Sequence, residues 1–445
     1  MAQLLPESAE TTRALPGEAQ WWPTDVLRAR QWHWLQEILR VARDTSPFYR
    51  RRMAGICGLP VSPEQLRLVP PVRREDLAEH AREIAPARDR VRQGPEGRSV
   101  RVRVPLDRAT YDWYVAGTRR GFQWWGVDPS DPVVSMLGRS WASRLSQGLV
   151  RSTGSQGNWR QFLVDHGFDD RIHHVLGEIV RFKPAVLYGY PSAVHRLVRG
   201  IREGAGPSRI PLKAVVLTGE PLYLFQRQAI ADTLQCPVIE EYGSVELGSV
   251  AFECPNGTLH VAAETVFLET LPGDAGGERL LATHLRNRAF PLIRYEIGDI
   301  GVLDSEPCGC GRGLPTLRIL GRASDGLAGA RWQSPARPLV ERCLGALPAG
   351  LQGRTRVLHP STGLVVLEVE RAPSGEIDRL DDLLAAARET FDPEWRIGVR
   401  QVERFVRLRS GKLPYFVRLD PTARRHHRLP ETFRRTPQIH VAWPR

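Results

Sequence analysis

Apolar runs and helical spacing alternate through the middle of the chain. In order, the pattern predicts helix, strand and helix over 170–203, a strand over 213–222, a helix over 224–234 and a strand over 237–244. Apolar strands that alternate with helices indicate βαβ units and a parallel sheet covered on both faces. Ligands bind such a sheet beyond the carboxyl ends of its strands, where 218–220 (TGE) and 242–246 (YGSVE) fall.

The pattern changes on either side of this region. Residues 24–44 have helical spacing with Thr24 as the expected N-cap, and 70–84 begin as a Pro-led helix. From Gly257 the chain becomes β-rich with glycine turns, which predicts a distorted barrel or a second sheet. Beyond Gly326 the pattern predicts helices over 335–347 and 376–391 and strands over 354–360, 363–371 and 398–408.

The expected fold is therefore α/β with two domains of unequal size. A large domain over 1–322 would combine parallel sheets flanked by helices with a β-rich subdomain. A small mobile α+β domain would follow over 326–420, and a basic tail over 421–445. The length of 445 residues suits this division.

Composition excludes several classes of protein. No apolar run reaches the ~18 residues needed to span a bilayer. Residues 1–20 lack a basic start followed by an apolar core, so we expect no signal peptide and a cytoplasmic protein. The net charge of +12 suits anionic small molecules such as ATP or coenzyme A, or simply reflects arginine on solvated faces. Without a helix-turn-helix, an RNP motif or zinc-finger spacing, a nucleic-acid partner is not expected.

Three cysteines and one histidine have the spacing of a closed zinc site. They form a C-x5-H and a C-x-C set: Cys254, His260, Cys308 and Cys310. Three thiols and an imidazole suit a structural Zn²⁺, which would staple the β-rich region without activating water. Free cysteines beside a surface histidine are the alternative. The other cysteines have apolar neighbours and are expected to be small buried side chains: Cys57, Cys236 and Cys343.

A block over 240–326 carries several motifs in order. It contains YGSVE, ECPNGTLHV, FPLIRYEIGD, CGCGRG and LRILGRASD, and LRSGKLPYF follows closer to the end of the chain. Their order resembles the adenylate-forming superfamily of acyl-CoA synthetases, luciferases and peptide-synthetase adenylation domains. The similarity runs from about Ser46 to Asp420 and is to the phenylacetate–CoA ligase-like branch. The segments SPFYRRRM and PPVRREDL also resemble N-terminal motifs of that branch.

The resemblance implies roles for residues that would bind ATP or AMP. Tyr242 would stack on adenine, Ser244 would contact the α-phosphate, and Glu246 would hold Mg²⁺. Asp299 would grip both ribose hydroxyls, since a carboxylate that accepts two O–H bonds is strong and directional. Without the resemblance, a strand-ending turn would explain YGSVE and a turn cap would explain Asp299.

Other site residues follow from the same family pattern. Gly219 and Glu220 would line the adenine pocket. Arg294 and Arg322 would accompany Asp299 at the ribose or phosphate.

Lys412 matches the lysine of the family's mobile small domain, with Asp325 at the hinge. The resemblance implies that this domain rotates between two poses. One pose brings the lysine to the substrate carboxylate and the α-phosphate, and the other opens a channel for a thiol or amine acceptor.

One expected element is missing from the pattern. The family closes a Ser/Thr/Gly-rich loop with a lysine over the β- and γ-phosphates, whereas the corresponding 92–113 segment holds only Gly94, Gly97 and Ser99 and no lysine. The loop is therefore expected to be deleted. A Gly/Ser/Thr run over 151–159 lies out of place and is better explained as a surface turn.

Two functional hypotheses follow. In the first, the chain is an adenylate-forming acid–thiol or acid–amine ligase. It would use ATP to activate an aromatic carboxylic acid and transfer the acyl group to CoA, a carrier-protein thiol or an amine. In the second, the missing loop makes it atypical. It would then condense a preformed acyl-adenylate or acyl thioester with an amine or thiol, or act as a non-catalytic nucleotide- or acyl-binding partner. The acyl pocket is expected near 188–190 and Trp124 or Trp125.

Overall fold

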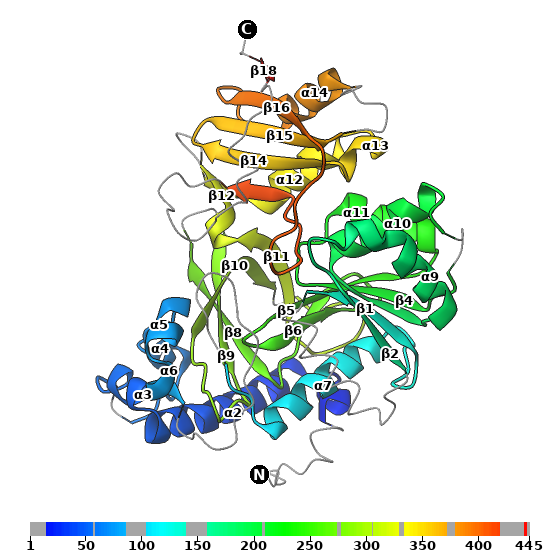
Figure 1. Ribbon diagram of the computed structural model, residues 1–445. Helices are drawn as coiled ribbons and strands as arrows, with labels where there is room; N and C mark the ends of the chain where they lie inside the picture. Colours follow the sequence, from blue (N-terminus) through cyan, green and yellow to red (C-terminus); the bar gives the residue numbers. More distant parts are fainter. Residues whose placement is uncertain are drawn as a thin grey trace.

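The fold is built on one continuous sheet of eleven strands and a separate sheet of five strands (Figure 1). The computed structural model describes residues 15–56, 58–85, 104–138, 158–206, 210–273, 277–304, 306–328, 333–371, 379–418 and 440–442. Among these residues, no helix combines the length and the apolar character that a membrane crossing requires. We call the part built on the large sheet the large lobe, and the part built on the five-stranded sheet the small lobe.

Half of the large sheet is parallel, as the sequence predicts. Its strands pair in the order β2 (Trp159–Leu163), β1 (Val133–Leu137), β3 (Val186–Gly189), β4 (Ala214–Thr218) and β5 (Val238–Ser244). Every residue of β1, β3 and β4 is buried, because helices cover this half. These helices are α7 (Arg108–Gln123), α9 (Ile172–Phe182), α10 (Pro191–Arg202) and α11 (Leu224–Leu234), with the 3-10 turn η1 (Asp169–Arg171) before α9.

The other half of the sheet is antiparallel. It continues from β5 through β6 (Gly248–Glu253), β7 (Leu259–Val261), β11 (Thr316–Arg322), β10 (Tyr295–Asp304), β9 (Glu278–His284) and β8 (Val266–Pro272). The expectation of a barrel or a second sheet is therefore corrected. The hairpin between β5 and β6 hydrogen-bonds the β-rich region directly to the parallel half.

One long and four short helices near the start of the chain cover the antiparallel half. They are α2 (Thr24–Thr45), α3 (Pro47–Arg52), α4 (Pro63–Leu66), α5 (Arg74–Glu79) and α6 (Ala81–Ile84). The predicted 24–44 helix is α2, although Pro23 and not Thr24 occupies its N-cap. Its apolar face, which includes Leu35 and Ile38, packs into the core formed by β8–β11 and their loops.

The small lobe has the predicted α+β composition. A 3-10 turn, η2 (Ala323–Asp325), leads from β11 into it. Its elements are β12 (Gly326–Ala328), β13 (Gln333–Pro335), α12 (Ala336–Gly345), α13 (Ala349–Gln352), β14 (Thr355–Ser361), β15 (Leu364–Glu370), α14 (Leu380–Thr390), β16 (Arg396–Val402), β17 (Phe416–Arg418) and β18 (His440–Ala442). The β18 strand pairs with β16, so this part of the expected tail belongs to the small sheet.

The two lobes share an apolar core at their junction. Tyr223 and Phe225, at the start of α11, pack with Tyr415 and Phe416 of the small lobe. Their rings meet at 5.4–5.9 Å between centroids. This contact places the loop before β17 over the carboxyl ends of the parallel strands (Figure 1).

Candidate active site

Three of the predicted nucleotide-binding residues form one cluster. The hydroxyl of Tyr242, on β5, donates to Asp299 Oδ2 at 2.7 Å, and Arg322 Nη1 lies 3.0 Å from Asp299 Oδ1. Asp299 and Arg322 are register partners on β10 and β11, so strand pairing itself brings them together. Burial and the Asp299 carboxylate raise the pKa of Tyr242, and Asp299 raises the pKa of Arg322. The tyrosine therefore stays a neutral donor.

Glu246 belongs to the same charged neighbourhood. Its Oε1 lies 3.1 Å from Arg74 Nη1 of α5, and the carboxylate is almost fully buried. Burial raises the pKa of the nearby Tyr295 phenol, and the charges of Glu246, Arg74, Arg322 and Asp299 also act on that pKa.

One oxygen of the Glu246 carboxylate already has a cationic neighbour. Mg²⁺ takes carboxylate oxygens at about 2.0–2.1 Å and usually keeps several waters. Arg74 Nη1 lies 3.1 Å from Oε1. A magnesium ion bound through that oxygen would therefore compete with Arg74.

Ser244 and Gly219 lie at the ends of neighbouring parallel strands. Ser244 Oγ accepts the amide of Leu247 at 3.1 Å, which closes the turn after β5. Gly219 has a φ of +78°, and a Cβ there would lie 2.9 Å from the ring of Tyr190. Only glycine fits this approach of backbone to ring.

Lys412 reaches the same edge of the sheet from the small lobe. Its Nζ lies 5.7 Å from the centroid of the Tyr190 ring and 3.6 Å from the position of a Cβ at Gly219. Only three of the 62 basic residues in the chain are lysines, the others being Lys183 and Lys213. Because the chain otherwise uses arginine, the rarity of lysine is a second sequence signal for Lys412, independent of the family motif.

Two predicted site residues have other partners. The Glu220 carboxylate accepts from Ser192 N, Ser192 Oγ and Leu413 N, so it links the two lobes. The Arg294 guanidinium is buried and bonds to Glu269 and to the carbonyls of Arg67 and Val69.

Arg294 thus anchors the segment that precedes α5 and lies outside the charged cluster. Glu220 and Arg294 each satisfy a partner that is distant in sequence. Nothing in the motif order indicates those partners.

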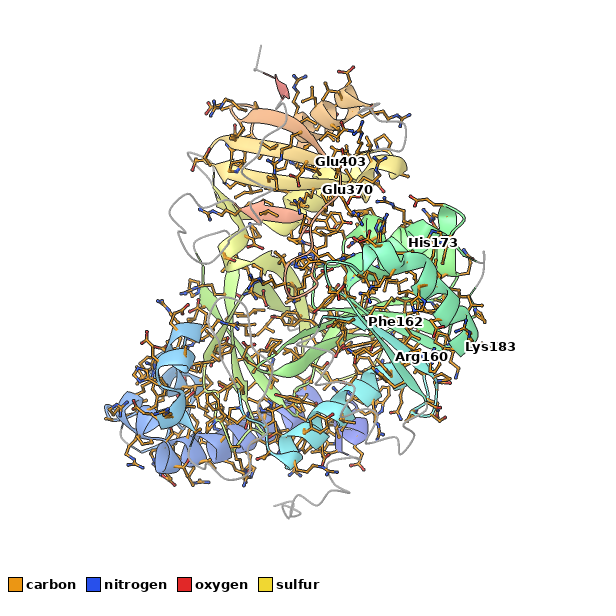
Figure 2. The ribbon with its side chains drawn as sticks, in the orientation of Figure 1. Arg160, Phe162, His173, Lys183, Glu370 and Glu403 are labelled. Carbon is orange, nitrogen blue, oxygen red and sulfur yellow. The ribbon has the colours of Figure 1, made fainter. Side chains whose placement is uncertain are left out.

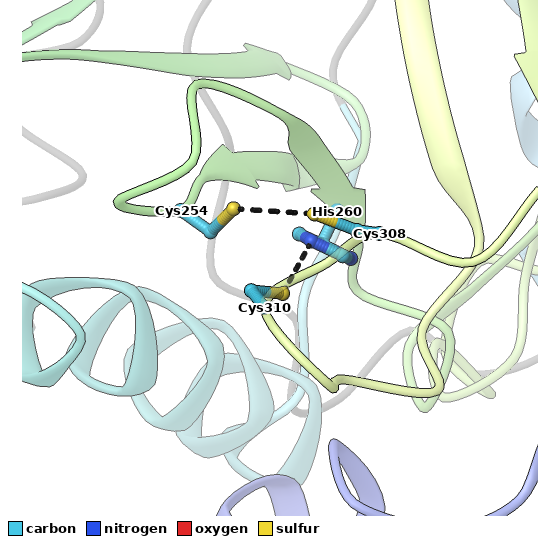
Figure 3. A group of neighbouring side chains, drawn as sticks. All are labelled: Cys254, His260, Cys308 and Cys310. Carbon is cyan, nitrogen blue, oxygen red and sulfur yellow. Dashed lines mark hydrogen bonds between the residues drawn. The ribbon is translucent and has the colours of Figure 1, made fainter.

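The cysteine and histidine set converges as the spacing predicts (Figure 3). The ligand atoms of Cys254, His260, Cys308 and Cys310 all lie within 4.8 Å of one another. Cys254 Sγ is 3.8 Å from Cys308 Sγ, and Cys310 Sγ is 3.2 Å from His260 Nε2. The residues come from the end of β6, from β7 and from the loop between β10 and β11.

The donor set fits zinc. His260 Nδ1 lies 3.2 Å from the carbonyl of Leu314, which fixes the tautomer and leaves Nε2 to face the thiols. Burial lowers the pKa of His260 to about 4, so the ring is neutral as a ligand must be. Trp124 packs edge-on against the His260 ring, and its Nε1 donates to Gln20 Oε1.

Several expectations remain untested or need refinement. Of the 92–113 segment, where the phosphate loop is expected to be deleted, 92–103 lie outside the described residues and 108–113 begin α7; the 151–157 run also lies outside them. Cys343 is buried as expected, whereas Cys236 is only half-buried and Cys57 is not described. Tyr188, predicted near the acyl pocket, is fully buried and donates to the buried Glu241 carboxylate.

Sequence reasoning missed Arg74 and Tyr295. Period-two spacing along β10 relates Tyr295 to Asp299 and could have indicated Tyr295. Arg74 was seen only as part of a helix start, because its pairing with Glu246 joins segments far apart in sequence.

Known proteins are similar to this chain in sequence and in fold. No protein-family model matches it. CapK of Staphylococcus aureus is 27% identical over 162 residues, or 36% of either chain, so the match spans just over a third of that relative. Phenylacetate–coenzyme A ligase of Thermus thermophilus is 25% identical over 339 residues, which covers 68% of this chain and 72% of the relative.

Among solved structures, 2-hydroxyisobutyryl-CoA ligase in the postadenylation state superposes with a TM-score of 0.76. It is 18% identical to this chain, and the superposition covers 94% of each chain. At this identity the similarity concerns the fold alone. The same ligase in the thioesterification state superposes with a TM-score of 0.58 over 95% of each chain. The two lobes of this chain are therefore arranged more like those of the postadenylation structure.

The chain shares the fold of an adenylate-forming CoA ligase. Over 68% of its length it is similar in sequence to a phenylacetate–coenzyme A ligase.

Proposed function

We propose that the chain activates an aromatic carboxylic acid as its acyl-adenylate and passes the acyl group to coenzyme A. The observation that carries this proposal is the position of Lys412 at the end of β4, beside Gly219 and Tyr190, while the neighbouring strand β5 carries Tyr242 of the Tyr242–Asp299–Arg322 cluster. Similarity to a phenylacetate–coenzyme A ligase supports both the acid class and the acceptor. Transfer to a carrier-protein thiol or to an amine is part of the same proposal, as is a cytoplasmic location.

In the first half-reaction, a carboxylate oxygen of the acid bonds to the α-phosphorus of ATP, and the bond from that phosphorus to pyrophosphate breaks. The Lys412 ammonium would neutralise charge that builds up between the two anionic reactants. Asp299 would hold the ribose, and Tyr242 would lie against the adenine. In the second half-reaction, the thiol sulfur bonds to the acyl carbon, AMP leaves with its oxygen, and the thiol proton is released.

A second candidate function is favoured by the Arg74–Glu246 ion pair. A carboxylate held by a guanidinium suits a site that receives no magnesium triphosphate. The chain would then condense a ready-made acyl-adenylate or acyl thioester with a thiol or amine. A non-catalytic partner that binds nucleotide or acyl groups is the limiting version of this candidate.

ATP–pyrophosphate exchange with a panel of aryl acids separates these candidates. Acid-dependent exchange supports the first. Absence of exchange, with turnover of a synthetic acyl-adenylate, supports the second, and nucleotide binding without either activity supports the non-catalytic version. An Arg74→Gln variant is included because it frees Glu246. If the ion pair blocks Mg²⁺, Mn²⁺ binding measured by electron paramagnetic resonance should tighten in this variant.

A further inference from the structure

A buried ion pair joins the two lobes beside Lys412. Arg407 of the small lobe is only 2% exposed, and its Nη2 lies 2.9 Å from Oδ1 of Asp169 in η1. Its Nη1 also donates to Ser192 Oγ at 2.9 Å and to the carbonyl of Gly411 at 3.2 Å. A buried charge is tolerated only when it is paired and hydrogen-bonded, and Arg407 meets that condition only while the lobes are in contact.

The residues on both sides of Lys412 are held by members of this contact network, Leu413 directly by the large lobe and Gly411 through Arg407. The carbonyl of Gly411 accepts from Arg407, and the amide of Leu413 donates to Glu220 Oε1 at 2.6 Å. Ser192 Oγ connects these contacts, because it accepts from Arg407 and donates to Glu220 at 3.1 Å. The backbone that carries Lys412 is thus fixed at two adjacent points.

Two glycines allow the loop to approach closely enough for these contacts. A Cβ at Gly138, after β1, would lie 1.8 Å from the carbonyl oxygen of Ser410. A Cβ at Gly411 would lie 2.0 Å from the carbonyl oxygen of Val164, and Gly411 has a φ of +81°. Backbone therefore packs directly on backbone at this part of the junction.

We propose that Asp169, Ser192, Glu220 and Arg407 form an interlobe clamp that positions Lys412 for acyl-adenylate formation. The clamp rests on the proposed function, since its purpose is to place the lysine at the reacting phosphate. Its members are positioning residues, because they act through the backbone around Lys412. When the small lobe rotates to admit an acceptor thiol, the clamp opens and Arg407 and Asp169 become solvated.

The chain supplies a matched control for this clamp. Arg404 and Asp170 form an ion pair across the same junction, next in sequence to Asp169 and three residues from Arg407. Their side chains are 48% and 60% exposed, and ion pairs exposed to this extent contribute little. A buried and an exposed pair at one junction can therefore be compared directly.

The first test measures docking without relying on activity. The variants are Asp169→Asn and Arg407→Gln, with Asp170→Asn and Arg404→Gln as controls. Each intact protein is treated briefly with an amine-acylating reagent, and mass spectrometry reads the labelling of Lys412 against Lys183. Lys183 is an exposed reference at the outer edge of the large lobe (Figure 2).

We expect labelling of Lys412 to rise at least fivefold in the clamp variants and to stay within twofold of the parent in the controls. Equal labelling in both sets, or no rise in the clamp variants, would overturn the proposal. Thermal unfolding of each variant checks that the fold is retained. A clamp variant that fails to fold is replaced by Glu220→Gln, for which the same rise is expected.

The second test separates the half-reactions. Clamp variants should lose at least tenfold in the rate of acyl-adenylate formation, while thioester formation from a supplied acyl-adenylate changes less than threefold. A merely structural role would lower both rates together and would contradict the clamp. If the parent protein forms no adenylate, the proposed function fails, and the labelling result still decides whether the clamp exists.

Discussion

The two sides of the candidate site are held in place by different means. Asp299 and Arg322 face each other because β10 and β11 pair in register, and Tyr242 joins them from the same sheet. Lys412, in contrast, stands on a turn of the small lobe that depends on contacts across the junction. The Tyr242–Asp299–Arg322 side of the candidate site is therefore part of the large sheet, whereas the Lys412 side is held in place by contacts between the lobes.

This difference separates binding from chemistry. Substitutions at Tyr242, Asp299 or Arg322, on the sheet, should weaken nucleotide binding in any arrangement of the lobes. Substitutions at Lys412 or in its loop should leave nucleotide binding nearly intact and slow adenylate formation. The predictions below test that separation, beginning with the largest expected effect.

Replacing Lys412 should have the largest effect. Lys412→Ala removes the ammonium near Tyr190 and Gly219, and we expect acyl-adenylate formation to fall at least ~100-fold, as loss of an electrostatic stabiliser does. AMP affinity, measured by calorimetry, should change less than threefold. Lys213→Ala removes a surface ion pair with Asp131 and is the control. An equal loss in both variants would show that Lys412 has no special role.

Replacing Asp299 should act on binding. Asp299→Ala removes the acceptor of the half-buried Tyr242 hydroxyl and the ion-pair partner of Arg322. We expect AMP affinity to fall ~10- to 100-fold, which corresponds to the loss of about 1.5–3 kcal/mol for hydrogen bonds to a charged group. Asp304→Ala, at the exposed end of the same strand, should bind normally.

Removing the metal should lower stability while leaving the lobe junction intact. We expect about one zinc per chain by elemental analysis. Cys310→Ser should lose the metal and lower the melting temperature by more than about 5 °C, because the site staples β6, β7 and the loop between β10 and β11. Cys236→Ser, at a half-buried cysteine outside the cluster, is the control. A metal-free protein with readily alkylated thiols at all four positions would exclude the site.

Adding a methyl group at Gly411, in the loop that carries Lys412, should weaken the contact between the two lobes. Gly411→Ala forces a Cβ against the carbonyl of Val164 and strains a φ of +81°. Gly363 also has a positive φ, +74°, but nothing lies within 4 Å of its Cβ position. Gly363→Ala therefore measures the strain alone. We expect acylation of Lys412 to rise about threefold in Gly411→Ala only, and similar labelling in both variants would contradict close packing.

Acid should destabilise the large lobe through His284. Its Nδ1 accepts the amides of Arg286 and Asn287 at 3.1 and 3.0 Å, and burial lowers its pKa from 6.5 to about 3. Because the folded pKa lies below the ordinary value, the unfolded chain binds the proton first. Stability should therefore fall as the pH drops from about 6.5 towards 3, by up to about 1.4 kcal/mol for each pH unit.

The measurement is urea unfolding at several pH values. His284→Gln should show a flatter dependence between pH 6.5 and pH 4.5, because an amide oxygen can accept the same bonds without titrating. An unchanged slope would assign the acid sensitivity to other groups. A steeper slope above pH 7 would contradict the assignment as well.

Local patterns predicted the parallel half of the fold well. The 224–234 helix and the helix–strand–helix of 170–203 appear as α11 and as α9, β3 and α10, because their spacing is set by neighbours in sequence. The convergence of the cysteines and histidine was also visible in their spacing.

The sequence did not predict which strands and side chains pair when they lie far apart along the chain. The β-rich region joins the parallel half through β5 and β6, and the predicted tail contributes β18 to the small sheet. Glu220 and Arg294 stand at the expected positions in the motifs, but their side chains bond to Leu413 and Glu269. Such partners depend on how the sheet and the lobes assemble.

The pairing of β18 with β16 makes 440–442 travel with the small lobe. In contrast, α2 lies under the large sheet at the opposite end of the molecule (Figure 1). A fluorescent donor on the exposed face of α2 and an acceptor just beyond β18 would thus ride on different bodies. Energy transfer between the two dyes would measure whether the distance between the lobes changes when ligands are added, without any change to the candidate site residues.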